Sequence, residues 1–443
     1  MPKDFYATRS TAWWKVAIAM IGSCLSGVTY VSVPGMVGSV GFGYLQMCIG
    51  FFLGYLVIAF VLSPLYFRLN VVSVYEYLDK RFGVLSHRTG AWFFFVSKLL
   101  GASVRLFLMI ATLQLLLAGP LGIPLWLTAL VVMALEWLYT VRGGVKAVIG
   151  LDIVKTVVML LSVVLCLALI GREVGEPDRG LMRVFYFDDV NHPQFFFKQL
   201  LGGLFTVVAC TGLDQDMMQR TLACRNLRDS QKNLIVSVLL QIVVIALFLF
   251  LGVYLHQFAA THNILATGDG LFPAVAWSGL LPAAPLVAGL FILGLVMAGF
   301  PAGGSALTAL TTSFTIDILG GKDRYRKWVH SGMAILMFGC ILLFYAVNST
   351  SVIDAVYRLA SYTYGPILGL FAFGLLFKRK VRDRLVPFVC VLAPLLCLLL
   401  DLNSEEWFGG YKFSYEILPL NAVFTMIGLW VDSLSFRAKR MSF

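Results

Sequence analysis

The sequence predicts an all-α membrane protein that crosses the bilayer many times, and three observations lead to this fold class. Apolar residues make up 59% of the 443 residues, above the ~45–50% that is usual for soluble domains. Charged residues make up only 13%, too few to cover the surface of soluble domains of this total length. The apolar runs are long and continuous rather than alternating, which argues against a transmembrane β-barrel. Composition also excludes disordered, collagenous and disulfide-stapled chains.

Apolar segments recur along the whole chain at the length that a transmembrane helix needs, about 20 residues. No run of polar sequence between them is long enough for a separate soluble domain. The twelve predicted spans are residues 12–37, 41–66, 88–118, 124–141, 146–171, 196–215, 232–256, 282–314, 327–347, 352–377, 385–401 and 415–435.

The loops between these segments alternate in their content of Lys and Arg, and this alternation orients the chain. One set of loops contains nearly all basic residues, for example Arg88, Arg220, Arg324 and Lys380, whereas Arg183 belongs to the sparse opposite set. The positive-inside rule places the first set, and both termini, in the cytoplasm. Because the basic residues are dispersed in short loops, the net charge of +11 does not indicate nucleic-acid binding.

Two spans are interrupted by polar and small residues. Residues 22–35 contain several serines and glycines with Thr29 and Pro34, and residues 202–212 contain Gly202-Gly203 and Thr211-Gly212. In hydrocarbon the backbone leaves helical geometry only where it lines a cavity or is buried in protein, so such breaks point to a binding site. The alternative, that small residues merely permit close helix packing, stays open for the span at 196–215.

Ionisable residues inside spans cost at least ~2.5–3.5 kcal/mol and are functional by default. Arg105 lies in the middle of its span, so it calls for a fixed anionic partner or an anionic ligand. Asp152 is a natural position for a cation or a proton. Lys98 and Lys155 lie near enough to a boundary to extend their amines to the membrane surface.

Residues 298–318, which begin within the span 282–314, are another unusual segment, with small residues and Pro301 in the first half and hydroxyls in the second. The hydroxyls can coordinate a cation, or satisfy the carbonyls that the proline frees. Simple close packing of helices is the favoured interpretation of this segment from composition alone.

Residues 211–226, TGLDQDMMQRTLACRN, resemble the signature of the sodium/solute symporter family. Similar family segments occur at 75–82, 143–152 and 314–318, in the same order and spacing along nearly the whole chain. The sequence is therefore identified as a member of this family, closest in pattern to its bacterial sialic-acid transporters. The resemblance implies a leucine-transporter-type fold of two inverted five-helix repeats with about 12 transmembrane helices. The single transporter domain, 1–443, would comprise repeat one at 12–171, repeat two at 196–377 and extra helices at 385–435.

The resemblance also implies a substrate site. The hydroxyl-bearing positions of the broken first helix correspond to Cys24, Ser26 and Thr29, so one hydroxyl is replaced by a thiol. The glutamine of the second helix corresponds to Gln46. The arginine that holds the sugar carboxylate corresponds to Arg105, which agrees with the anion that this residue calls for. A carboxylated substrate is therefore suggested.

The main sodium site that the resemblance implies takes backbone carbonyls from Gly22, Leu25 and Ala298. Two adjacent serine hydroxyls complete that site in the family, but Pro301 and Ala302 stand at those positions here. A hard cation such as Na⁺ needs several oxygen ligands, so coupling through this site is in doubt.

A second, less widespread sodium site of the family retains Asp152 and Ser305, although Gly304 replaces one of its serines. Na⁺ is therefore the expected coupling ion. Protonation of Asp152 is the alternative.

We expect a secondary active transporter that takes up a small polar, carboxylated, sugar-like solute with Na⁺ by alternating access, in a bacterial inner membrane. A proton-coupled transporter of the same fold and a non-transporting ligand sensor are the alternatives. An enzyme is not expected, because no His/Asp/Glu cluster lies at a membrane face. The expected partners are the solute and the lipid bilayer, without nucleic acid, and the oligomeric state stays open.

Overall fold

The computed structural model describes residues 11–70, 73–281, 283–320, 323–347 and 352–441, and for residues 142–150, 316, 323 and 436–441 it gives the backbone path alone. Statements about structure below refer to these residues. The chain ends at 1–10 and 442–443, which we predicted to be cytoplasmic, lie outside them.

The described residues are mainly helical, and each predicted span has a helical counterpart. Nine continuous helices in these ranges are long and apolar enough to cross a membrane, and two bent pairs bring the number to eleven. The twelfth predicted span corresponds to a shorter apolar helix, Leu125–Val141. The long elements are α4–η1–α5 (Tyr44–Leu69), α7–η2 (Val84–Ala118), α8 (Leu125–Val174), α11 (Leu227–Thr261), α13 (Ala284–Ser313), α14 (Arg326–Val347), α15 (Val352–Leu376), η8–α16 (Asp383–Leu402) and α18 (Ile417–Met441).

The bent pairs are the two spans that the sequence marked as interrupted. The first consists of α1 (Trp13–Cys24) and α2 (Gly27–Gly35), which meet at 58°. The second consists of α9–η4 (Phe196–Gly212) and α10 (Gln215–Leu222), which meet at 70°. Short helices at the ends of the bundle include α3 (Val37–Val40), α6 (Glu76–Arg81), α12 (Leu271–Trp277) and α17 (Ser404–Trp407).

One boundary differs from the prediction. The predicted spans 124–141 and 146–171 belong to one continuous helical element, α8, so the expected loop between them is wrong. No proline occurs in this stretch, and the two glycines only lower helix propensity by about 1 kcal/mol each. The apolar parts on either side, Leu125–Val141 and Leu151–Val174, still match the predicted spans.

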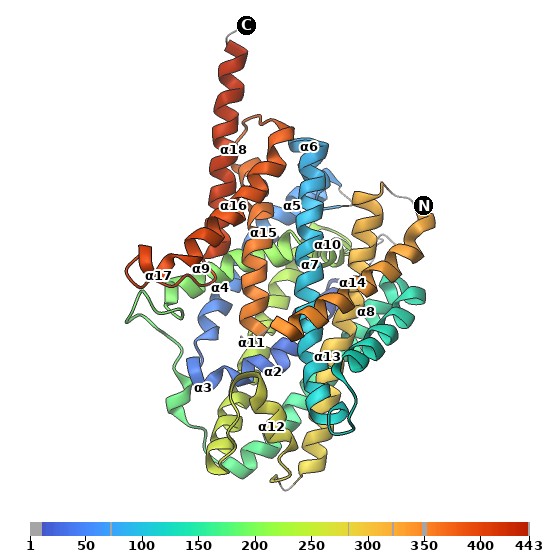
Figure 1. The fold of residues 1–443 in the computed structure, drawn as a ribbon, viewed down its shortest axis with the longest axis vertical. Coiled ribbons are helices and arrows are strands. Elements are labelled where there is room, and N and C mark those ends of the chain that lie inside the picture. Colours follow the sequence, from blue (N-terminus) through green and yellow to red (C-terminus); the bar gives the residue numbers. More distant parts are fainter. Residues whose placement is uncertain (1–10, 71–72, 282, 321–322, 348–351, 442–443) are drawn as a thin grey trace.

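The helices form one bundle around the bent pairs (Figure 1). α8 packs along α13, α4 packs along α9, and α15 packs against both α7 and α18. α1 and α2 contact α8, α11 and α13 in the interior. The breaks of two spans therefore lie inside the protein, where irregular backbone is tolerated.

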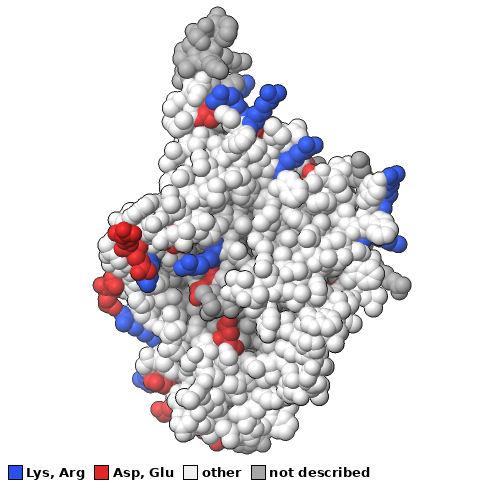
Figure 2. Space-filling model, viewed as in Figure 1, with Lys and Arg blue, Asp and Glu red and all other residues white. Residues whose placement is uncertain are grey.

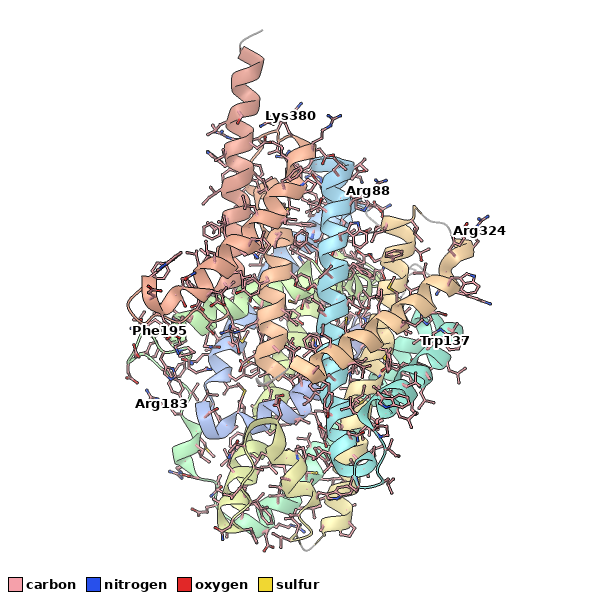
Figure 3. The ribbon with its side chains drawn as sticks, in the orientation of Figure 1. Arg88, Trp137, Arg183, Phe195, Arg324 and Lys380 are labelled. Carbon is pink, nitrogen blue, oxygen red and sulfur yellow. The ribbon has the colours of Figure 1, made fainter. Side chains whose placement is uncertain are left out.

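Charged side chains avoid most of the surface in view. Figure 2 shows a broad uncharged face, with Lys and Arg at the upper end and right edge and, together with Asp and Glu, along the left side. Figure 3 places Arg88, Arg324 and Lys380 in these regions and Arg183 low on the left. Arg183, from the sparse set of loops, thus lies apart from these three residues of the basic set.

Candidate functional site

The first break places a turn of free backbone in the interior. α1 ends at Cys24, the amide of Leu25 donates to the carbonyl of Ile21 at 2.9 Å, and the Ser26 amide donates to the Thr29 hydroxyl at 3.4 Å. The last carbonyls of a helix have no partner one turn ahead. The break therefore offers carbonyl oxygens to a cation or a donor.

The second break is held open by side chains from other helices. Asp214 caps α10, because its carboxylate accepts the amides of Asp216 at 2.9 Å and Met217 at 3.2 Å. The hydroxyl of Tyr66 donates to the Gly212 carbonyl at 3.0 Å, and that of Tyr75 to the Leu213 carbonyl at 2.9 Å. Carbonyls freed by the bend are thus satisfied inside the protein.

A cavity of about 130 Å³ lies between the two broken spans. Three of the five predicted substrate residues line it: Cys24, Thr29 and Arg105. Its other walls combine aromatic rings with aliphatic and polar side chains, and Lys98 and Asp214 also line it. Such a mixture suits a small polar molecule. The aromatic lining residues are Tyr44, Phe51, Tyr55, Tyr357 and Tyr364.

Arg105 on α7 lines this cavity and also an adjoining one. Its side chain is only partly buried, and no hydrogen bond or ion pair of Arg105 occurs within the part of the chain that the structure describes. The fixed anionic partner that its position called for is therefore not present among these residues. Ser26 lines the adjoining cavity with Arg105.

The adjoining cavity contains the two residues of the second predicted sodium site, with an arginine between them. Arg220 of α10 pairs with Asp152 (Nη1 to Oδ2, 2.7 Å) and donates to the Ser305 hydroxyl at 2.6 Å. Both charged side chains are buried, at 5% and 1% exposure. Ser23 donates to the same Asp152 carboxylate at 3.3 Å. A guanidinium thus occupies the place between the carboxylate and the hydroxyl.

Two further carboxylates join this cluster through Lys98 of α7. Its amine lies 3.2 Å from Asp214 and 3.1 Å from Asp216. Asp216 also lies 3.4 Å from Arg220, and the Tyr364 hydroxyl donates to Asp214 at 2.8 Å. The expectation that Lys98 extends to the membrane surface is therefore wrong, because its amine instead pairs with the buried Asp214 and the partly buried Asp216.

Gln46 lies apart from both cavities. Its side chain is fully buried, its amide nitrogen donates to the carbonyls of Gly43 at 3.3 Å and Gln194 at 3.0 Å, and its oxygen accepts the Tyr186 amide at 3.0 Å. Its hydrogen bonds fasten the loop before α9 to the start of α4. The structure does not bring Gln46 together with the other predicted substrate residues.

The residues of the main predicted sodium site are buried near the first break. Gly22 packs so closely on α8 that an added Cβ would lie 2.7 Å from the Asp152 carbonyl oxygen. Leu25 is also buried and lines the larger cavity, and Ala298 is fully buried in α13. Lys155 is also fully buried, so the expectation that its amine reaches the membrane surface is wrong.

Sequence reasoning missed Arg220 and Asp216 as members of the site. Both follow the second break, and the analysis of loop charges counted Arg220 as a cytoplasmic loop residue. The available signal was their spacing of four residues, which pairs an acid and a base on one helix face.

The sequence is similar to those of known proteins along most of its length. The family model described as sodium:solute symporter family matches residues 5–384. The chain is 25% identical over 442 residues to sodium-coupled monocarboxylate transporter 1 of Mus musculus, covering 94% of this chain and 70% of that protein. It is 24% identical over 398 residues to the sodium/iodide cotransporter of Homo sapiens, covering 84% and 61% of the two.

Two solved structures share the fold. One is a Na⁺-coupled sialic acid symporter in a substrate-bound outward-open state, with a TM-score of 0.77 and 18% identity over 97% of this chain and 91% of that one. The other is a nucleobase-cation-symport-1 family transporter, with a TM-score of 0.63 and 11% identity over 100% and 96% of the chains. These likenesses confirm the predicted fold class.

Proposed function

We propose, from the premise that this chain belongs to the sodium:solute symporter family, that it is a secondary active transporter of a small carboxylated solute. The chain is an integral membrane transporter rather than an enzyme, and Na⁺ is the coupling ion of its family. That the solute bears a carboxylate does not follow from family membership, and this part of the proposal needs its own support.

The single observation that carries the carboxylate is Arg105. Its guanidinium lines the cavity between the broken spans and has no partner among the described residues. A partly buried guanidinium without a partner is costly unless an anion joins it, and its planar fork matches a carboxylate with two parallel hydrogen bonds. Cys24 and Thr29 line the same cavity and would contact other polar groups of the solute.

The pairing of charges around the cavities supports an anion. Of the basic side chains that line them among the described residues, Lys98 is paired with Asp214 and Asp216, and Arg220 with Asp152 and Asp216. Arg105 is left as the lining cation that a ligand would neutralise.

The names of similar proteins point the same way. The monocarboxylate and iodide transporters are named for anions, and the solved symporter is named for sialic acid, a sugar that bears a carboxylate. These names belong to those proteins, and they support the proposal for this chain through the shared chemistry of their ligands.

Three side chains around the adjoining cavity would suit Na⁺ as the coupling ion. Asp152, Ser305 and Ser23 contribute a carboxylate and two hydroxyls, which are donors that suit a hard cation. Arg220 competes for the same carboxylate in this conformation. A bound Na⁺ would supply positive charge here, and it would favour the conformation in which Asp152 is accessible to it.

The test is uptake into proteoliposomes of labelled sialic acid and, separately, of labelled pyruvate. An inward Na⁺ gradient, an inward proton gradient and no gradient are compared. We expect accumulation driven by Na⁺ that unlabelled carboxylates inhibit and a neutral hexose does not. Accumulation driven only by protons would indicate the proton-coupled alternative. Binding of a carboxylate without accumulation under either gradient would indicate a sensor and contradict the proposal.

A further inference from the structure

Glu136 of α8 is a buried acid that the proposed function does not use. Its side chain is fully buried, and both of its carboxyl oxygens lack a hydrogen-bond partner. Among the described residues it is the only acid with both oxygens in that state. Burial of an ionised carboxylate without a partner costs far more than burial of the neutral acid. The carboxyl group therefore needs a neutralising cation, which is either a metal ion or a proton.

The carboxyl group packs directly against the backbone of α13. A Cβ added to Gly303 would collide with both carboxyl oxygens of Glu136, so the glycine is what makes room for the acid. The next residue, Gly304, meets α8 in the same way, because an added Cβ would lie 2.9 Å from Thr140 and 3.1 Å from the ring of Tyr139. The space that the two glycines leave on α13 is thus filled by side chains of α8.

This packing favours a proton over a metal ion. Na⁺ in proteins is held by several oxygens, and no group of three His, Cys, Asp or Glu side chains among the described residues could hold a metal ion. Gly303 lines the adjoining cavity, whereas Glu136 is not among the residues that line it. Glu136 therefore lies behind the Gly303 turn of α13, outside the space that is open to an ion.

The elements that face Glu136 bring no positive charge to it within the described chain. α13 presents Gly303, which has no side chain. On α14, His330 is buried, and its two ring nitrogens each lie 2.9 Å from a hydroxyl, those of Thr140 and Thr311. The imidazole is therefore already engaged by two threonines.

The other neighbours of α8 have their ionisable groups elsewhere. α1 and α11 approach α8 at Gly22 and Gly171, in the half of α8 that carries Asp152. The ionisable side chains of α7 have partners or surroundings of their own. They are His87, which pairs with Asp317, the exposed Arg88, Lys98, which pairs with Asp214 and Asp216, and Arg105, which lines the two cavities.

On α8 itself, Tyr139 lies about one turn from Glu136 on the same face. Its hydroxyl oxygen is also buried without a partner. Glu136 and Asp152 are the two carboxyl groups of the described residues whose charge acts on this tyrosine. Glu136 is thus close to the ion cavity electrostatically, although it does not line it.

Asp152, the residue whose protonation is the alternative to Na⁺ coupling, has different surroundings. It pairs with Arg220 at 2.7 Å and accepts a hydrogen bond from Ser23 at 3.3 Å. An opposite charge and a hydrogen-bond donor both favour the charged form of a carboxyl group. Glu136 has neither, so of the two acids it is the one whose surroundings favour the protonated form.

We propose that Glu136 is a proton-binding site, separate from the cation site at Asp152 and occupied in this conformation. The bound proton lets α8 and α13 close on each other at Gly303 without a stranded charge. A proton that the chain takes up in this interior region is then held on Glu136 rather than on Asp152. This site goes beyond the proposed function and does not depend on which solute is transported.

The proposal fixes the sign of a pH effect on stability. A glutamate in contact with water ionises near about pH 4.3, so the unfolded chain releases at neutral pH a proton that the folded chain keeps. As the pH rises above that value, the folded state is disfavoured, and its equilibrium with the unfolded state shifts by up to about tenfold per pH unit for this one proton. A neutral side chain at position 136 removes this loss.

The test compares thermal unfolding of the detergent-purified full chain between about pH 5 and about pH 9. Wild type, Glu136→Gln and a control are measured without solute, in NaCl and in choline chloride at equal ionic strength. The matched control is Glu405→Gln, which removes an exposed acid of α17 that pairs with Lys412. Infrared spectra at alkaline pH detect the carbonyl stretching band of a protonated carboxyl group.

We expect Glu136→Gln to unfold at a higher temperature than the wild type at alkaline pH, with a difference that shrinks as the pH falls and is the same in both salts. The control should follow the wild type. The wild type should show the infrared band and Glu136→Gln should lose it. A midpoint of Glu136→Gln that is lowered in NaCl but not in choline chloride would indicate a bound metal ion and overturn the proposal. A difference that is constant with pH, or a band that survives the substitution, would overturn it as well.

Glu136→Met is a second neutral replacement of similar length, and it takes the same comparison if Glu136→Gln does not purify as a folded protein. Failure of both variants to fold would contradict the proposal, because each replaces a neutral acid by a neutral side chain. Neither readout uses a solute. Failure of carboxylate uptake would therefore reject the proposed function and leave the result at Glu136 standing, and the opposite combination would do the reverse.

Discussion

Two basic side chains on one face of α7 differ in what neutralises them. Lys98 is neutralised by Asp214 and Asp216, at 3.2 and 3.1 Å. Arg105, two turns further along, has no such partner among the described residues. The two carboxylates at the second break thus neutralise Lys98, whereas Arg105 stays available to a ligand of the cavity.

Arg105→Ala should weaken binding of a carboxylated solute while leaving binding of a neutral analogue nearly unchanged. Hydrogen bonds to a charged group contribute about 1.5–3 kcal/mol, so the Kd should rise about tenfold to a hundredfold. Isothermal titration or scintillation proximity binding on purified protein measures this ratio directly.

The matched control for Arg105→Ala is Arg183→Ala, which removes an exposed arginine from the loop before α9 and should leave both affinities unchanged. Arg105→Lys keeps the charge but loses the planar fork, so it should recover affinity only in part. Equal loss of the acidic and neutral ligands in Arg105→Ala would show that the arginine is structural.

Arg220→Met should strongly destabilise the protein, because it leaves the Asp152 carboxylate buried without its cation. Removal of one partner of a buried ion pair costs about 3–5 kcal/mol. The double variant Asp152→Asn/Arg220→Met should regain part of the lost stability, since no charge is then stranded. Thermal unfolding of the four proteins of this cycle measures the coupling.

A second outcome of the Arg220 substitution concerns the ion. Arg220→Met vacates the place between Asp152 and Ser305, so Na⁺ should stabilise this variant more than the wild type. Two results would contradict a functional ion pair between Asp152 and Arg220. One is that the losses of stability in Asp152→Asn and Arg220→Met add up in the double variant. The other is that Na⁺ stabilises Arg220→Met no more than the wild type.

A charged residue could be recognised from sequence when it lies inside an apolar run, and it was missed when it could equally belong to a loop. Arg105 and Asp152 lie deep within apolar runs, so sequence alone marked them as special. Arg220 follows a break, and a charged residue after an interrupted span looks the same as a loop residue. Arg220 lies in the interior because η4 and α10 meet at a 70° bend. The angle of a bend cannot be predicted from the spacing of residues in the sequence.

At the scale of helices, the contact of α1 with α8 sets the position of the first break. Gly22 is the point of closest approach, because a Cβ there would meet Thr156 and the Asp152 carbonyl. The absence of a side chain therefore lets α1 lie against the part of α8 that carries Asp152 and Lys155.

Gly22→Ala should push α1 away from α8 and lower both stability and uptake. Overpacking of a tight interior contact costs about 1–3 kcal/mol. Gly339→Ala on α14 is the matched control, because an added Cβ there meets nothing within 4 Å and alanine raises helix propensity by about 1 kcal/mol. Thermal unfolding and uptake of both variants give the comparison. Equal behaviour of the two would show that the α1–α8 contact is not tight.

Elements were more predictable than their contacts. Long apolar runs and the glycine- and serine-rich interruptions located the spans and both breaks, because the bilayer imposes one length and one hydrogen-bonding rule on every helix. The missed feature was the continuity of α8 through residues 142–150. Basic residues in that stretch indicated a loop, but positive charge reports the membrane side and does not end a helix.

For the whole molecule, alternating access requires that the cavity between the broken spans opens to each side of the membrane in turn. Cys24 offers a reporter for this movement, because its thiol lines the cavity and lies 3.4 Å from the Tyr55 hydroxyl. The other partly buried cysteines of the described chain are Cys210 and Cys340. Their replacement by alanine leaves Cys24 as the least buried thiol.

In this background, a membrane-impermeant thiosulfonate applied from either side of proteoliposomes should modify Cys24, and Na⁺ should shift the ratio of the two rates. A carboxylated solute at ten times its Kd should slow both reactions about tenfold, since occupied cavities exclude the reagent. A Cys24→Ser variant gives the background rate. Modification from one side only, under every gradient and ligand condition, would mean that the cavity binds but does not alternate. That result would favour the sensor over the transporter, because a population shift between two open states is what couples binding at Arg105 to movement across the bilayer.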